Sequence, residues 1–131
     1  APDYVLVPEN KAQAMAEALL AEVRSSYPQP ASDPDYSGVI SERHRKRLLD
    51  AITVAREKGA TVLTYEEEEA VKAGKVPPTV VLNAPEETIL ASEEIFGPVL
   101  PIVPYRQLDD AIAYVNERDR PLALYCFSND E

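Results

Sequence analysis

Residues 99–127 decide the fold, and they read VLPIVPYRQLDDAIAYVNERDRPLALYCF. Apolar side chains recur at helical spacing in the middle of this stretch, at Leu108, Ala111, Ile112 and Val115. A stripe with the spacing i, i+3, i+4 and i+7 is typical of an amphipathic helix. Asp109 and Asp110 fall in its first turn, where the helix dipole favours negative charge. The pattern therefore predicts a helix that begins near residue 108.

Apolar, extended-type segments flank this helix on both sides. Pro121 bars the helix from continuing into Leu122–Phe127, an unbroken apolar run that is typical of a strand buried on both faces. On the other side, Val99–Tyr105 contains Pro101 and Pro104. Because proline has no N–H to donate to a ladder, we expect this segment to be bent or partly unpaired.

The rest of the chain alternates in the same way. Strands are expected at Tyr4–Val7, Ala60–Thr64 and Thr79–Leu82, and helices at Asn10–Arg24 and from Ser41 to Gly59. Asn10 and Ser41 are the expected N-caps, and Gly59 supplies a C-terminal stop. Strands that alternate with amphipathic helices predict an α/β fold, with a mainly parallel sheet and flanking helices.

The composition limits both the architecture and the partners. A chain of 131 residues is expected to form one domain, and 45% hydrophobic residues are too many for a disordered acidic chain. The formal net charge of −10 argues against a nucleic-acid partner, because a phosphate-facing surface needs an excess of Lys and Arg. No run approaches the ~18 apolar residues of a transmembrane helix, so no membrane span is expected.

The cysteine and histidine content restricts the chemistry. Cys126 is the only cysteine and His44 the only histidine, which excludes an internal disulfide and the usual Cys/His zinc site. Carboxylates alone remain open as ligands of Mg²⁺ or Ca²⁺, but no metal ligands are assigned. A single cysteine fits a reducing compartment, and we expect a cytoplasmic protein. Cys126 alternates with Leu122 and Leu124 on the predicted strand, so we expect it to pack rather than react.

The densest candidate site is EEIFGP at residues 93–98. Neighbouring side chains of an extended segment point to opposite faces, so Glu93 and Glu94 cannot both reach one substrate atom, and a glycosidase-like carboxylate pair is disfavoured. The same period places Glu94 and Phe96 on one side. A carboxylate can accept hydrogen bonds from both hydroxyls of a ribose, while an aromatic ring flanks the attached heterocycle. The competing interpretation is an exposed acid pair beside a core phenylalanine.

His44 lies in the charged run ERHRKR at residues 42–47. These basic side chains could contact phosphate, but we expect them to face solvent and offset an otherwise acidic surface. No Gly-rich phosphate loop and no Ser-His-Asp set is present in the sequence. If the protein is an enzyme, most of its machinery therefore lies outside this chain.

The segment EEIFGPVLPI at residues 93–102 resembles the signature of the aldehyde dehydrogenase superfamily. APDYVL at residues 1–6 looks like the segment that follows the catalytic cysteine in the class 3-like branch, which includes the fatty and coniferyl aldehyde dehydrogenases. VISERH at residues 39–44 and PLALY at residues 121–125 look like the same branch. Since these matches follow one another in order, the resemblance implies that residues 1–131 are part of an aldehyde dehydrogenase catalytic domain.

The resemblance also implies an activity and a cofactor site. The whole enzyme would oxidise an aldehyde to the carboxylic acid with NAD or NADP, and among the substrates of this branch we favour coniferyl aldehyde. A cysteine thiolate would form a thiohemiacetal, hydride would pass to the cofactor, and a glutamate would activate water to release the acid. By position, Glu94 matches the glutamate that holds the nicotinamide ribose, and Phe96 the aromatic on the nicotinamide side. Glu93 has no assigned role, whereas His44 and Arg47 match a helix beside the cofactor in some members.

The departures from the family pattern limit what this chain can do alone. The catalytic cysteine would lie just before Ala1, with the general base and the dinucleotide fold further upstream. Cys126 does not match the position of that catalytic cysteine. No catalytic residue is therefore assigned, and the chain by itself is expected to be inactive. We also expect a homo-oligomer, because a piece of a larger enzyme exposes apolar surface that promotes association. The alternative is a stand-alone acidic α/β module that binds a protein partner.

Overall fold

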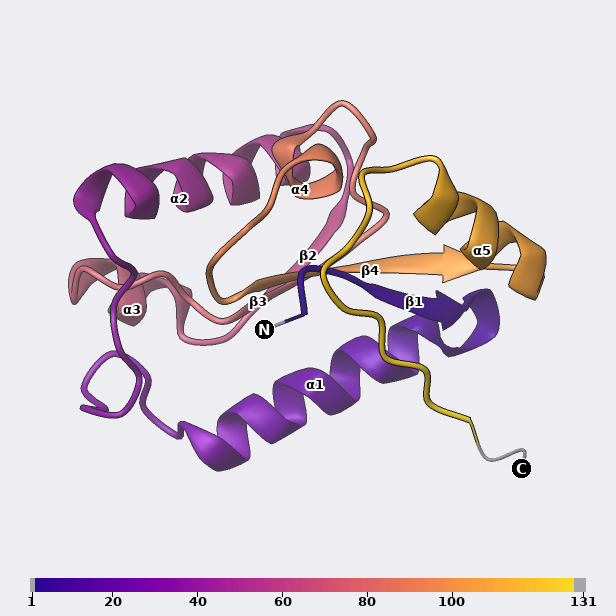
Figure 1. Ribbon diagram of the computed structural model, residues 1–131. Coiled ribbons are helices and arrows are strands. Elements are labelled where there is room, and N and C mark those ends of the chain that lie inside the picture. The colour runs from indigo at the N-terminus through magenta and orange to yellow at the C-terminus, as the bar shows by residue number, and fades with distance from the viewer. Residues whose placement is uncertain (1, 129–131) are drawn as a thin grey trace.

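Four strands form one sheet in the order β1-β4-β3-β2 (Figure 1). The computed structural model describes residues 2–128. The strands are β1 Val5–Pro8, β2 Thr61–Thr64, β3 Thr79–Leu82 and β4 Val99–Tyr105. β4 pairs in parallel with β1 and with β3, whereas β2 runs antiparallel to β3 at one edge. This arrangement confirms the predicted α/β fold with a mainly parallel sheet.

Helices cover both faces of the sheet. They are α1 Ala12–Ser26, which follows a 3₁₀ turn at Glu9–Lys11, then α2 Glu42–Glu57, α3 Glu67–Lys72, α4 Ile89–Ser92 and α5 Leu108–Asn116. Figure 1 shows α1 on one side of the sheet and α2, α4 and α5 on the other. Within residues 2–128, no helix is long and apolar enough to cross a membrane.

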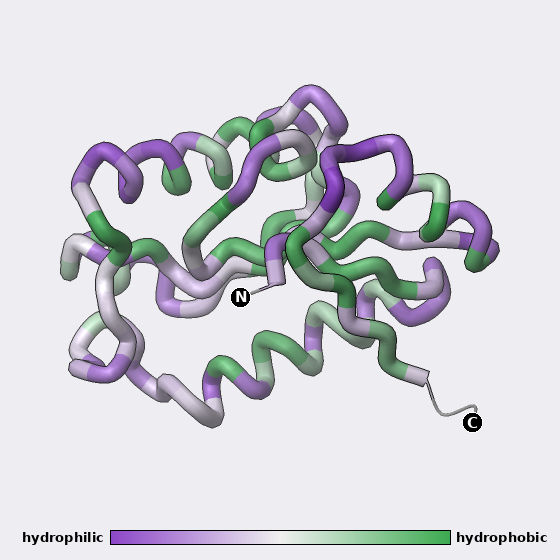
Figure 2. The backbone as a smooth tube through the Cα atoms, viewed as in Figure 1, coloured by the Kyte–Doolittle hydropathy of each residue, from purple (hydrophilic) through white to green (hydrophobic). Residues whose placement is uncertain are grey.

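The strands supply two separate hydrophobic cores, because successive side chains of a strand point to opposite faces. Val80, Leu82 and Ile102 pack with the buried face of α1, whereas Val81 and Val99 pack with the buried face of α2. Figure 2 shows hydrophobic residues along the strands at the centre and hydrophilic residues on the outer turns of the helices. The two layers of helices therefore clamp β3 and β4 from both sides.

The ends of α2 follow the expected rules, but the start of α1 does not. The side chain of Ser41 accepts a hydrogen bond from the backbone N–H of His44 at 3.2 Å, and Gly59 beyond the helix has a φ of 90°. Both predictions are confirmed. Asn10 is not an N-cap, because the chain first tightens into a 3₁₀ turn and α1 begins after Lys11 without a side-chain cap.

β4 is a continuous central strand despite its two prolines, but it pairs with β3 only over residues 99–102 and with β1 only over residues 102–105, so the expectation of a partly unpaired segment is confirmed. The N–H of Thr79 in β3 donates to the carbonyl of Pro98 at 2.9 Å. Alternate residues of a parallel strand direct their peptide groups to opposite neighbours. The backbone N–H and C=O groups of even-numbered residues in β4 therefore point toward β3. The nitrogen of Pro104 accordingly faces β3, and that of Pro101 faces β1.

Each proline lies just beyond the paired part of the neighbouring strand that it faces. β1 begins at Val5 and β3 ends at Leu82, and both of these residues lie opposite Ile102. Pro101 therefore precedes the ladder with β1, and Pro104 follows the ladder with β3. Neither missing N–H removes a hydrogen bond from the sheet, which is why both prolines are tolerated in a central strand.

The segment Leu122–Phe127 is not a strand, and the prediction of a buried strand there is wrong. Phe127 is 93% exposed, and Cys126 is exposed as well, so the expectation that this thiol is packed in a core is also wrong. A strand needs a neighbour for its N–H and C=O groups, and within residues 2–128 no strand pairs with this segment. Figure 2 shows it as a hydrophobic run that leads to the C-terminal end.

The predicted apolar stripe of α5 is present but only partly covered. Ala111 is buried, whereas Leu108 is exposed and Ile112 is 50% exposed. Ring contact between Tyr114 and Tyr4, with centroids 5.4 Å apart, joins α5 to the residue before β1. The outer side of α5 and the segment after it therefore leave apolar surface open.

Candidate functional site

Residues 93–98 form the turn that joins α4 to β4, and we call it the EEIFGP turn. It is non-helical, and Glu93 has extended dihedral angles of φ −127° and ψ 153°. Ile95 is 2% exposed, whereas Glu94 and Phe96 on either side of it are exposed. The regular alternation ends at Phe96, which has a φ of 51°. The turn thus holds one side chain in the core and presents its two neighbours to solvent.

Phe96 is the unusual residue of the turn. Its side chain is 74% exposed, so the competing interpretation of a core phenylalanine is wrong. A positive φ is uncommon for a residue that carries a Cβ, and such conformations cluster at functional sites. An exposed aromatic ring on a constrained backbone is suited to meet a flat partner.

Two side chains of α2 hold the backbone of the EEIFGP turn. The guanidinium of Arg47 donates to the carbonyl of Glu94 at 2.9 Å and to that of Ile95 at 3.4 Å. Nε2 of His44 lies 2.9 Å from the carbonyl oxygen of Phe96. The expectation that these basic residues face solvent is wrong for both, because each is partly buried against the turn. Their i, i+3 spacing on the buried side of α2 could have indicated this.

The two glutamates of the turn have different surroundings. Arg47 forms an ion pair with Glu93, with Nη2 and Oε2 3.0 Å apart. Within residues 2–128, the carboxylate of Glu94 makes no hydrogen bond or ion pair. Glu93 is therefore engaged in a structural contact through one of its oxygens, whereas both carboxylate oxygens of Glu94 are free to accept from a ligand. This difference weakens the carboxylate-pair hydrolase further.

The turn is also held from the opposite end of the chain and by close packing. The N–H of Ile95 donates to Oδ1 of Asp3 at 2.8 Å, a contact across 92 positions that no sequence pattern indicated. At Gly97, a Cβ would overlap Cδ1 of the fully buried Leu48. Any larger residue would force the side chain of Leu48 to shift, because α2 and the turn approach so closely.

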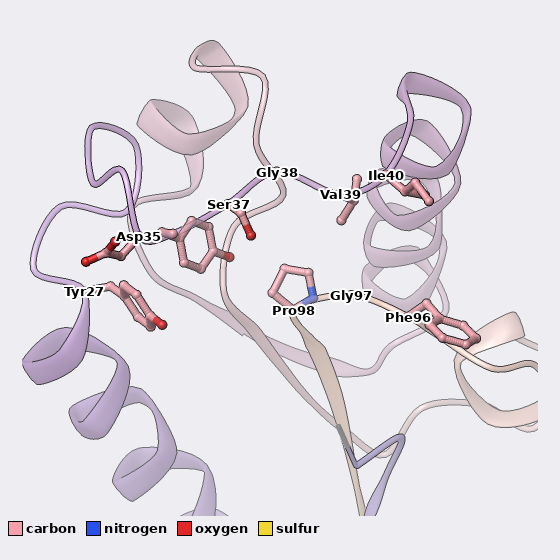
Figure 3. Close-up of a pocket in the computed structure, with 10 residues that line it drawn as sticks. Tyr27, Asp35, Ser37, Gly38, Val39, Ile40, Phe96, Gly97 and Pro98 are labelled. Atoms are coloured by element: carbon pink, nitrogen blue, oxygen red, sulfur yellow. The ribbon is translucent and has the colours of Figure 1, made fainter.

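A hollow of about 410 Å³ lies beside the turn (Figure 3). Figure 3 shows Phe96 at one end of it, with the ring directed away from Pro98, and Tyr27 and Asp35 at the other end. Tyr36 lines the same hollow and donates from its hydroxyl to the carbonyl of Val76 at 2.7 Å. Burial raises the pKa of Tyr36, so its hydroxyl stays protonated and keeps this hydrogen bond.

Comparison with known proteins gives a consistent assignment. A family model described as the aldehyde dehydrogenase family matches residues 1–131. A probable coniferyl aldehyde dehydrogenase of Pseudomonas aeruginosa is 43% identical over 131 residues, which are 100% of this chain and 27% of that relative. A coniferyl aldehyde dehydrogenase of a Pseudomonas species is 41% identical over 134 residues, covering 99% of this chain and 28% of that relative. The chain thus spans little more than a quarter of these relatives.

Solved structures are similar over the same range. A substrate-bound structure of Staphylococcus aureus AldH has a TM-score of 0.85 and 35% identity, covering 100% of this chain and 28% of that one. A Mycobacterium tuberculosis aldehyde dehydrogenase in complex with NAD⁺ has a TM-score of 0.68 and 30% identity, covering 88% of this chain and 25% of that one.

We expect Gly97→Ala to destabilise the protein, because the added methyl group would overlap the buried side chain of Leu48. Overfilling a packed core costs about 1–3 kcal/mol. Urea-induced unfolding measures this loss. Gly38→Ala is the matched control, because nothing lies within 4 Å of a Cβ at that position. Equal losses in the two variants would contradict the packing argument.

Proposed function

This chain belongs to the aldehyde dehydrogenase family, and from that premise we propose that it is part of the catalytic domain of an enzyme that oxidises an aldehyde to a carboxylic acid with NAD or NADP. We propose further that Glu94 and Phe96 bind the nicotinamide-ribose end of the cofactor. The observation that carries this assignment is the unpaired carboxylate of Glu94 on a turn whose backbone is fixed.

The residues present fit such a cofactor. A carboxylate offers two acceptor oxygens, and the adjacent hydroxyls of a ribose offer two donors. The Glu94 carboxylate has no competing partner within residues 2–128. Phe96 offers an exposed apolar face two residues away, where it would flank the ring attached to that sugar. When bound, NAD or NADP supplies the hydride acceptor, and these two side chains orient it.

We place the reactive thiol outside residues 1–131. The mechanism that we propose is attack of a cysteine thiolate on the aldehyde carbon to give a thiohemiacetal. A reactive cysteine needs an electropositive, partly exposed setting, whereas Cys126 is exposed but has no Lys, Arg or His partner within residues 2–128. Coniferyl aldehyde is the substrate that the names of the similar Pseudomonas proteins favour.

We expect substitution of Glu94 to weaken the cofactor site selectively in the full-length enzyme. Glu94→Gln removes the charge that accepts the ribose hydrogen bonds, and hydrogen bonds to a charged group contribute about 1.5–3 kcal/mol. The KM for NAD⁺ or NADP⁺ should therefore rise roughly 10- to 100-fold, with the KM for the aldehyde nearly unchanged. Steady-state kinetics with each substrate varied in turn measures both values.

The matched control is Glu57→Gln, which removes the same charge from an exposed position at the end of α2. It should leave both KM values unchanged. If Glu94→Gln behaved like this control, Glu94 would not be a cofactor ligand.

We expect the 131-residue chain on its own to show no aldehyde-dependent reduction of NAD⁺ or NADP⁺, because its one thiol, Cys126, has no Lys, Arg or His partner within residues 2–128 to activate it. Absorbance at the wavelength of the reduced nicotinamide monitors this over hours at high protein concentration. Turnover that disappears in Cys126→Ser would disprove the placement of the nucleophile.

We also propose that the protein forms homo-oligomers. The supporting observation is exposed apolar surface on and after α5, which includes Leu108, Leu122, Leu124 and Phe127. Light scattering of the chain at high concentration should give the mass of a dimer or a larger species. A monomeric mass throughout would contradict this expectation.

A further inference from the structure

Three consecutive carbonyl groups of the EEIFGP turn point to one side of α2, and two side chains of that helix bind them. We propose that Arg47 and His44 are positioning residues, which act through the backbone of the turn to hold Glu94 ready for the ribose. This inference rests on the proposed function of Glu94. It assigns to α2 a role in setting cofactor affinity without direct contact to the cofactor.

Arg47 makes the larger share of these contacts. Nη2 donates to the carbonyl of Glu94 at 2.9 Å and to Oε2 of Glu93 at 3.0 Å, while Nη1 reaches the carbonyl of Ile95 at 3.4 Å. The arginine side chain is 28% exposed, so these bonds are partly shielded from water. A planar guanidinium can span acceptors on successive residues, whereas a lysine ammonium is a single point charge. The contact therefore depends on arginine and not on positive charge alone.

His44 holds the next carbonyl, at the residue with the unusual backbone. Its Nε2 lies 2.9 Å from the carbonyl oxygen of Phe96, which has the φ of 51°. A carbonyl oxygen can only accept, so Nε2 of His44 carries the hydrogen and donates. A conformation that costs free energy persists only where the surroundings determine it. The hydrogen bond from His44 holds the backbone at Phe96, where the turn departs from extended geometry.

Other contacts also hold the EEIFGP turn, and they leave the carboxylate of Glu94 projecting from it into solvent. Asp3 accepts the N–H of Ile95 at 2.8 Å, and the Ile95 side chain is buried in the core beneath α2. On the other side of Glu94, the N–H of Glu93 donates to the carbonyl of Ile89 at 2.9 Å, so the backbone is held on both sides, while the Glu94 side chain has no partner within residues 2–128. A ligand that meets a fixed acceptor does not have to order it first, which increases affinity.

A residue that acts through Glu94 should lose its effect when Glu94 is removed, and a double-mutant cycle in the full-length enzyme tests this. The variants are Arg47→Ala, Glu94→Gln and the two combined. The Kd for NAD⁺ or NADP⁺, whichever the enzyme uses, is measured by titration calorimetry, with KM, kcat and the midpoint of thermal unfolding. We expect Arg47→Ala to raise Kd about tenfold by misplacing the turn, with the aldehyde KM unchanged. The double variant should be no more than about twofold weaker than Glu94→Gln.

Conservative replacements separate positioning from a general loss of structure. Arg47→Lys keeps the positive charge but loses the planar guanidinium that spans several acceptors. It should therefore recover only part of the cofactor affinity that Arg47→Ala loses. His44→Gln keeps a side-chain N–H that can donate, so it should bind the cofactor more tightly than His44→Ala. Glu93→Gln leaves the bonds from Arg47 to the carbonyls in place and should change Kd less than about threefold. Arg43→Ala is the control, because Arg43 is exposed on the same helix.

Each other result overturns the inference. An unchanged Kd in Arg47→Ala with a raised Kd in Glu94→Gln removes the role of Arg47 and leaves the proposed function intact. Losses that multiply in the double variant mean that Arg47 acts independently of Glu94. An unchanged Kd in Glu94→Gln removes the proposed cofactor ligand and this inference with it. If Arg47→Ala does not fold, equal affinities of His44→Gln and His44→Ala would overturn the proposal.

Discussion

The contact between the guanidinium of Arg47 and the EEIFGP turn joins the helical layer to the central strand of the sheet. α2 packs on one face of the sheet through Leu48 and Ile52, and the same helix binds the backbone that leads into β4. Packing and hydrogen bonds therefore connect helix, turn and strand. The absence of a Cβ at Gly97 allows this close approach.

Held in this way, the turn combines a rigid backbone with two exposed side chains of different chemistry. The acid one residue before, Glu93, is used to orient Arg47, which leaves Glu94 without a competitor among the described residues. Adjacent and chemically identical residues thus have different surroundings because Ile95 fixes which way the turn faces the core. The division depends on packing and hydrogen bonding, and not on differences in the side chains themselves.

Local patterns in the sequence predicted the elements well and the long-range contacts poorly. The stripe of α2, its Ser41 cap and the strand β3 follow from spacing and residue type alone. The segment Leu122–Phe127 was predicted as a strand from its apolar character, but a strand also needs a paired neighbour, which composition does not supply. The exposed Phe96 and the hydrogen bond that the N–H of Ile95 donates to Asp3 likewise depend on residues far apart in the chain.

The two prolines of β4 restrict the register in which this strand can pair with β1 and β3. If β4 slid so that Pro104 lay opposite Leu82, Pro104 would stand in the place of Ile102. Proline has no N–H, so it could not donate the hydrogen bond that Ile102 is placed to make to β3. A slide the other way would bring Pro101 to the position of Val103 beside β1, with the same loss. Either displacement would remove a ladder bond, which contributes about 1 kcal/mol. The register of the sheet therefore fixes where the EEIFGP turn before β4 presents the side chains of Glu94 and Phe96 at the surface.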